Sequence, residues 1–161
     1  MTIVIIGVLF LCITIFFAYI IRGNSADEVK LYIYLILISV SSDIGGYTFG
    51  KIFKGPKLTL ISPKKTFSGV FGSFFFSLIP IIIYNFLDYD NIYSQISAKN
   101  IFIVFLLSSI NQIGDISISY FKRKNNLKDT GNILPGHGGL LDRIDGILFV
   151  IFSFGLIKFL N

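Results

Sequence analysis

Residues 119–145 read SYFKRKNNLKDTGNILPGHGGLLDRID, a basic, glycine-containing segment with carboxylates at its end. It joins two strongly apolar runs, at about 101–121 and 142–160. About 20 apolar residues at a rise of 1.5 Å each cover a hydrocarbon core of about 30 Å. The segment is therefore predicted to be a loop at a membrane surface, between two spanning helices.

The composition of the whole chain agrees with this. Of the 161 residues, 53% are hydrophobic and 14% charged, whereas ordinary soluble domains carry about 25% charged residues. Mean hydropathy is +0.77. We predict an all-α fold, a polytopic transmembrane helical bundle of about five membrane-spanning helices, forming one integral membrane domain over 1–161. The five apolar runs lie at about 2–21, 31–50, 67–87, 101–121 and 142–160.

Two further expectations concern the first run. Cys12 is the only cysteine, so no intrachain disulfide can form. The run has no basic start and no small-residue cleavage site, which favours a retained helix over a cleaved signal peptide.

The basic residues predict the orientation of the chain. Ten of the fourteen lie in two of the connecting segments, which fall on the same side of a five-helix bundle. Because loops rich in Lys and Arg face the cytoplasm, the N-terminus is predicted to be cytoplasmic and the C-terminus outside. The same rule explains the net charge of +5 without a nucleic-acid partner. The ten residues are Lys51, Lys54, Lys57, Lys64, Lys65, Lys122, Arg123, Lys124, Lys128 and Arg143.

Acidic side chains occur inside the predicted spans. Asp43 and Asp115 each lie about seven residues before the basic end of their run, and Asn111 and Gln112 lie one turn further in than Asp115. An ionisable group in a membrane marks a functional site by default. An interhelical hydrogen bond, or an acid near the interface, is the structural alternative.

A second acidic pair opens the last run. Asp142 and Asp145 are three residues apart and share a helix face. Stabilisation of the helix dipole would also account for them. Together with Asp43 and Asp115 they can converge at one depth, where carboxylates and basic loops suit Mg²⁺ and its phosphate ligands.

The two basic loops offer phosphate-binding groups. Residues 62–66, SPKKT, combine hydroxyls and lysines, although topology and attraction to anionic lipid also explain lysines there. His137, the only histidine, lies in a glycine-rich turn before the last run, where backbone N–H groups can approach an anion. It is a candidate metal ligand, phosphate contact or acid–base group, or simply a polar loop residue. Gly45, Gly46, Gly69 and Gly72 indicate close helix packing.

These residues resemble the signature of the phosphatidate cytidylyltransferase (CDP-diacylglycerol synthase) family. The resemblance covers about 43–161, the motif-bearing catalytic region. One block holds Asp43, Gly45 to Tyr47, Gly50-Lys51, residues 62–66 and Gly69, and Gly114-Asp115 forms another. The main block holds Ser119, Lys122-Arg123, Lys128-Asp129, Gly131, Leu134-Pro135, His137-Gly138-Gly139, Asp142-Arg143 and Asp145.

The resemblance implies an enzyme, a nucleotidyltransferase that makes CDP-diacylglycerol and pyrophosphate from CTP and phosphatidate with Mg²⁺. It also implies a homodimer in a bilayer, expected to be a bacterial inner (plasma) membrane, with the active site facing the cytoplasm. Implied metal ligands are Asp115, Asp142 and Asp145. Implied catalytic residues are these three with Lys122, Arg123, Lys128, His137 and Arg143. Implied substrate-binding residues are Asp43, Ser62, Lys64, Lys65, Thr66, Asp129, Gly138 and Gly139.

Other functions remain open at this point. A CTP-dependent lipid kinase would share such a pocket, and a shortened inactive homologue would bind lipid or a partner. A channel would need a polar stripe along a helix, whereas polar residues here gather at one end. Members of the family usually have more helices before the Asp43 block, so we expect either a compact member or a chain without its N-terminal helices.

Overall fold

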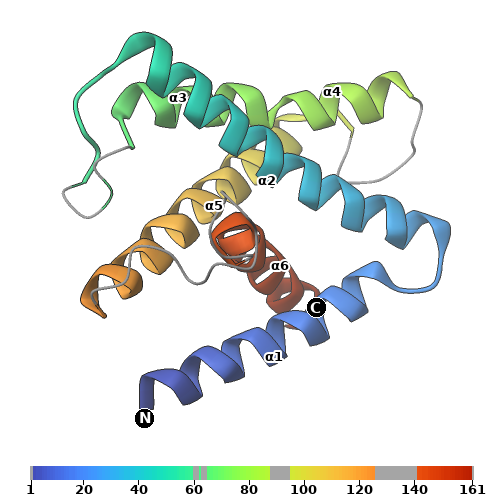
Figure 1. Ribbon diagram of the computed structural model, residues 1–161. Coiled ribbons are helices and arrows are strands. Elements are labelled where there is room, and N and C mark those ends of the chain that lie inside the picture. Colours follow the sequence, from blue (N-terminus) through green and yellow to red (C-terminus); the bar gives the residue numbers. More distant parts are fainter. Residues whose placement is uncertain (1, 60–61, 63–64, 88–94, 126–140, 161) are drawn as a thin grey trace.

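The computed structural model describes residues 2–59, 62, 65–87, 95–125 and 141–160. Within these ranges the chain forms six α-helices (Figure 1). They are α1 (Thr2–Arg22), α2 (Ala26–Phe53), α3 (Phe67–Ser77), α4 (Ile79–Phe86), α5 (Ala98–Lys124) and α6 (Leu141–Leu160).

Polar N-terminal caps explain why two helices begin earlier than the apolar runs. Ser25 and Glu28 form a capping box, so α2 starts five residues before the predicted position, 31. Ser97 accepts a hydrogen bond from the backbone N–H of Asn100 and starts α5 at Ala98 instead of 101. The hydrophobic pattern could not locate these ends because their first turns are polar.

The third apolar run, predicted as one helix over 67–87, forms two. α3 ends before Leu78, and α4 begins at Ile79 with Pro80 in its first turn. Proline has no backbone N–H, and its ring clashes with the carbonyl group four residues earlier, which here belongs to Phe76. The two helices together still make an apolar segment of 20 residues, Phe67–Phe86.

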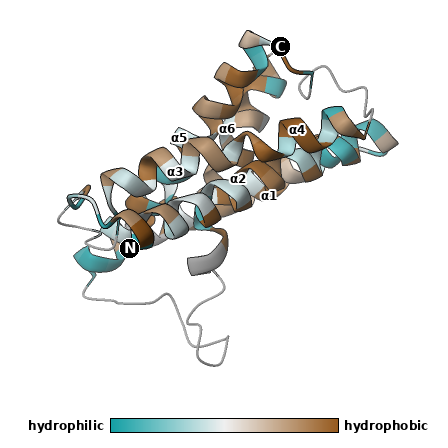
Figure 2. Cartoon of the chain, turned by 90° about the horizontal axis from the view of Figure 1, so that it is seen from above, coloured by the Kyte–Doolittle hydropathy of each residue, from teal (hydrophilic) through white to brown (hydrophobic). Residues whose placement is uncertain are grey.

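Length and composition make this an integral membrane protein. Four described segments are long and apolar enough to cross a bilayer: Ile5–Arg22, Ala26–Phe53, Phe67–Phe86 and Ala98–Lys124. The fifth predicted run forms α6, whose 20 residues would extend about 30 Å. Large apolar side chains such as Phe71, Phe75 and Phe86 are exposed, and hydrophobic residues recur along the helix ribbons (Figure 2). The predicted all-α polytopic fold is confirmed.

α6 lies at the centre of the bundle, between α1 and α5, and also contacts α2 (Figure 1). Gly114 of α5 lies against the ring of Phe149, and Gly155 lies against Phe17 of α1. The core around these contacts consists of apolar side chains from α1, α2, α4, α5 and α6, among them Phe17, Ile38, Leu107 and Val150.

Glycines set the crossing of α2 and α3. A Cβ atom on Gly45 would collide with the backbone oxygen of Gly72, and one on Gly72 would collide with that of Gly45. A Cβ atom on Gly69 would lie 2.8 Å from the backbone oxygen of Gly46. The close packing expected from these four glycines is confirmed, and it brings the loop between the two helices close to α5.

Candidate functional site

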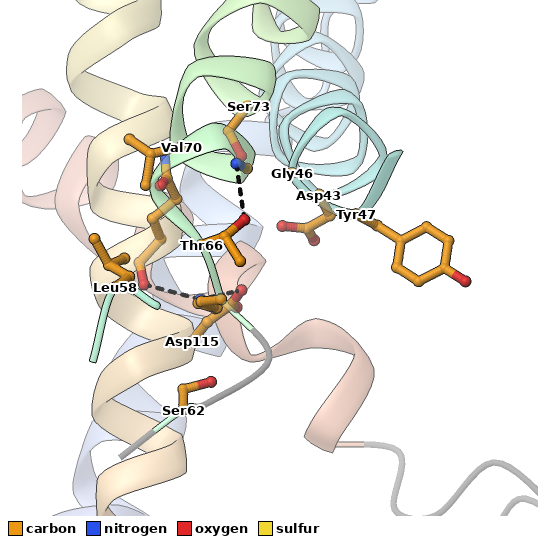
Figure 3. A pocket seen from close by; sticks show the side chains of 12 residues that line it. Asp43, Gly46, Tyr47, Leu58, Ser62, Thr66, Val70, Ser73 and Asp115 are labelled. Carbon is orange, nitrogen blue, oxygen red and sulfur yellow. Dashed lines mark hydrogen bonds and ion pairs between the residues drawn. The ribbon is translucent and has the colours of Figure 1, made fainter. Parts of the chain in front are cut away.

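A cavity of about 260 Å³ opens where α2, α3 and α5 meet the loop between α2 and α3. Its polar lining comes from segments far apart in the sequence (Figure 3). The lining residues are Asp43, Gly46, Tyr47, Leu58, Ser62, Lys65, Thr66, Gly69, Val70, Ser73, Gln112 and Asp115.

The loop over residues 54–66 carries Lys65 into this cavity. The backbone turns away from α2 at Lys54, which has a left-handed conformation (φ 47°). The loop then folds back on itself, since Leu58 N donates to Lys65 O at 2.8 Å and Phe67 N to Pro56 O at 3.0 Å. Thr66 caps α3 by accepting a hydrogen bond from Gly69 N. These bonds hold the backbone at Lys65 and in the residues that follow it.

Lys65 and Asp115 form an ion pair across the cavity. Lys65 Nζ lies 2.9 Å from Asp115 Oδ2 and donates a second bond of 3.2 Å to the backbone oxygen of Gln112. The two side chains are 26% and 21% exposed, so the pair is partly shielded from solvent. The other oxygen, Asp115 Oδ1, is buried and accepts no N–H or O–H bond of standard geometry from the described residues, although the Asp145 carboxyl group lies close to Asp115.

Asp43 is held by an amide from α5. Asn111 Nδ2 donates to Asp43 Oδ1 at 2.6 Å, and Asn111 is fully buried. The interhelical hydrogen bond considered as the structural alternative for Asp43 is thus present. Asp43 nevertheless lines the cavity, and it lies within electrostatic range of Lys65 and Asp115.

A third carboxylate, that of Asp145 on α6, approaches Asp115 without lining the cavity. Asp145 interacts electrostatically with Asp115 and Lys122, and its Oδ1 accepts a hydrogen bond from Gly146 N. Gly146 permits this approach, because a Cβ atom there would collide with Asn111 Oδ1 and lie 2.8 Å from Asp115 Oδ1. Asp43, Asp115 and Asp145 therefore converge from three helices.

A divalent cation such as Mg²⁺ needs several hard oxygen ligands. Within the described residues, no three acidic, histidine or cysteine side chains form a metal cluster by themselves. The unpartnered, buried oxygen of Asp115 and the nearby carboxylates are nevertheless hard oxygen ligands, the type that Mg²⁺ prefers. Mg²⁺ also takes ligands from water and substrate phosphates, so the residues present fit such an ion.

Several predicted site residues lie outside the described part of the chain. These are Lys64, Lys128, Asp129, His137, Gly138 and Gly139. Asp142 and Arg143 lie in the first turn of α6, but their side chains are also outside the described part. Ser62, Lys65 and Thr66 line the cavity, whereas Lys122 and Arg123 lie in the last turn of α5 and do not line it.

Two polar residues of α5 have larger structural roles than the sequence assigned to them. Asn111 binds Asp43, and Gln112 lines the cavity and gives its backbone oxygen to Lys65. Both are amides within a predicted span, and that signal alone could have marked them as site residues.

Comparison with known proteins gives one consistent result. A family model described as "Cytidylyltransferase family" matches residues 1–160. A phosphatidate cytidylyltransferase of Staphylococcus haemolyticus (strain JCSC1435) is 39% identical over 132 residues, which are 80% of this chain and 49% of that protein. One of Staphylococcus aureus (strain COL) is 40% identical over 129 residues, 78% of this chain and 48% of that protein. The chain thus spans about half the length of the curated relatives it matches.

Proposed function

The chain belongs to the cytidylyltransferase family, and from this premise we propose that it transfers CMP from CTP to phosphatidate. The products are CDP-diacylglycerol, used in phospholipid biosynthesis, and pyrophosphate. The cavity that joins Lys65, Asp115 and Asp43 carries the proposal. It offers cationic and anionic groups close together in a membrane protein.

The proposed reaction is a direct displacement at phosphorus. A phosphate oxygen of phosphatidate attacks the α-phosphorus of CTP and forms a new P–O–P bond. The bond from that phosphorus to the bridging oxygen breaks, and pyrophosphate leaves with the electron pair. No covalent protein intermediate is needed, since such transfers depend mainly on positioning and on stabilising charge.

The residues are proposed to serve two tasks, holding the metal and contacting the substrates. Asp115 and Asp145, with Asp142, are proposed to hold Mg²⁺, with Asp43 beside them. When bound, Mg²⁺ would neutralise the phosphate oxygens. Lys65, Ser62 and Thr66 are proposed to contact phosphate from the loop, as are Lys122 and Arg123 from the end of α5. The remaining predicted site residues, whose side chains lie outside the described part of the chain, are proposed to complete the substrate contacts. They are Lys64, Lys128, Asp129, His137, Gly138, Gly139 and Arg143.

The location of the cavity suits these two substrates. It lies at the end of α2 that carries Lys51 and at the loop rich in lysine, which the positive-inside rule assigns to the cytoplasm, where CTP is available. Phosphatidate would enter from the bilayer. We further propose that the protein works in a bacterial inner membrane as a homodimer.

The test is CDP-diacylglycerol formation by the purified chain in detergent, from phosphatidate, CTP and Mg²⁺. We expect product from the wild type and a loss of at least about 100-fold in Asp115→Asn and Asp142→Asn, because a lost charge contact of this kind costs about 3 kcal/mol of barrier. Asp27→Asn is the matched control, since Asp27 is an exposed acid paired with Lys30 at the other end of α2.

Two outcomes would contradict the proposal. Full turnover by Asp115→Asn would exclude that carboxylate from catalysis. No turnover by a folded, monodisperse wild type would mean that this chain, which spans about half the length of the relatives it matches, does not catalyse the reaction by itself.

A further inference from the structure

We propose that Lys65 is a built-in counter-cation, which neutralises Asp115 in the substrate-free protein, is displaced by the arriving divalent cation, and then turns to the nucleotide phosphates. The inference rests on the proposed function and adds an order of events. In this order the metal enters first, and Lys65 then binds the triphosphate.

The first support is that two cations, Lys65 and the proposed metal ion, bind the same carboxylate. Asp115 is the proposed metal ligand nearest the cavity, yet its Oδ2 is bound by Lys65 Nζ at 2.9 Å. A divalent cation that approaches either oxygen of this carboxylate is repelled by the ammonium group beside it. Binding of such a cation therefore favours movement of the ammonium group away from Asp115.

The second support is the local charge. Asp43 and Asp145 lie within electrostatic range of Asp115, so carboxylates from three helices share one region. Like charges at such distances destabilise one another unless a cation lies between them. Asp145 also lies within electrostatic range of Lys122. Lys65 forms an ion pair of 2.9 Å with Asp115. It therefore stabilises the protein until a metal takes over.

The third support is the way Lys65 is held. Its backbone is fixed by the bonds of Leu58 N and Lys65 N, so the chain does not have to move. Its side chain is a flexible four-carbon stem, and Ser62 and Thr66 line the same cavity beside it. Rotation of this side chain is enough to transfer the ammonium group from Asp115 to a phosphate at these hydroxyls.

The test measures metal binding with neither CTP nor lipid present. The full chain in detergent is titrated with Mn²⁺ as the probe, and free Mn²⁺ is followed by electron paramagnetic resonance. We expect Lys65→Met to bind Mn²⁺ about fivefold more tightly than the wild type, since a partly exposed ion pair contributes about that factor. Lys65→Arg keeps the charge and should restore the wild-type affinity.

Thermal unfolding separates this role from a merely structural one. Lys65→Met should lower Tm without metal, and Mn²⁺ should raise its Tm more than that of the wild type. Lys30→Met is the matched control, because it removes an ion pair of 3.1 Å at the far end of α2 and should leave Mn²⁺ affinity unchanged. Unchanged or weaker Mn²⁺ binding in Lys65→Met would overturn the proposal.

A measurement on the wild type does not depend on whether the variants fold. Acylation of individual lysines by an amine-reactive reagent is followed by peptide mass spectrometry, with and without Mn²⁺. Release from Asp115 should speed the acylation of Lys65 and leave that of Lys30 unchanged. Equal or slower acylation of Lys65 with Mn²⁺ would overturn the proposal. Because no substrate is present, these outcomes are independent of whether CDP-diacylglycerol is formed.

Discussion

Asn111 links the cavity to the core of the bundle. It is fully buried and binds Asp43 at 2.6 Å, while its own Oδ1 has no partner among the described residues. Its carbonyl oxygen lies against Gly146 of α6. A single side chain thus contacts elements that bring all three carboxylates together, and changes there should affect both stability and the site.

Asn111→Leu is predicted to lower the free energy of unfolding by about 1–3 kcal/mol, because Asp43 loses its buried donor. Denaturant unfolding in detergent would measure this. Ser109→Ala is the control, since the Ser109 hydroxyl donates to Phe105 O of its own helix and to no other residue of the described ranges. Equal stability of the Asn111 variant and the control would contradict the assigned role.

Gly146→Ala is predicted to destabilise the protein by about 1–3 kcal/mol, because its Cβ atom would push Asn111 and Asp115 away from α6. The same substitution at Gly7 meets nothing within 4 Å. Since alanine favours a helix over glycine by about 0.5–1 kcal/mol, Gly7→Ala should be neutral or stabilising. Thermal unfolding of the two variants, measured as the change in Tm from the wild type, tests this prediction. An equal change in both would contradict it.

At the scale of elements, α2 is the helix on which the site is built. It contacts α3 through glycines and α5 through a hydrogen bond of 2.8 Å between the hydroxyls of Ser42 and Ser108. Both serines are fully buried. Small polar residues at such contacts let helices approach closely in a membrane.

This contact predicts a disulfide. In a Cys12→Ser background, Ser42→Cys with Ser108→Cys should cross-link under mild oxidation, because adjacent side-chain oxygens imply Cβ atoms close enough for a disulfide. Ser41→Cys with Ser108→Cys is the control, since the neighbouring position points about 100° away around the helix. A shift in gel mobility on reduction would show that the disulfide has formed. Equal cross-linking of both pairs would contradict the packing of α2 against α5.

The sequence predicts that the helices exist more accurately than it predicts where they begin and end. Hydrophobic length alone located the five apolar runs, and the glycines of α2 and α3 predicted their close contact. The break at Leu78 was missed because one proline in an apolar run does not decide whether a helix continues. The ion pair between Lys65 and Asp115 could not be predicted from the sequence either. Its partners are 50 residues apart and meet only through the tertiary fold.

At the scale of the whole molecule, Lys158 connects three helices at the end of the bundle opposite the cavity. Its Nζ lies 3.3 Å from Glu28 Oε1 and 3.4 Å from the backbone oxygen of Ile20. Thus α6 is joined to both α1 and α2 at this end. The carboxylates and the lysine-rich loop lie at the other end, which gives the molecule two chemically different faces.

The two faces predict opposite accessibility. In a Cys12→Ser background, Lys57→Cys should react from the cytoplasmic side and Asn24→Cys from the outside, because both positions are exposed and the lysine-rich loop is expected in the cytoplasm. Labelling of sealed, right-side-out vesicles with a membrane-impermeant maleimide would show this. Labelling of Lys57→Cys but not Asn24→Cys would reverse the topology.

The hydrogen bond between Asp43 and Asn111 also has a consequence for biosynthesis. Its partners are separated by 68 residues, which take roughly 3–14 s to synthesise at about 5–20 residues per second. During that interval α2 has left the ribosome with its acid, whereas α5 does not yet exist. A charged group inside the bilayer raises the free energy of insertion. Before α5 is made, α2 should therefore remain at the translocon or near the membrane interface. Ribosome-bound chains ending before residue 111 would then be less resistant to alkaline extraction than those that include α5.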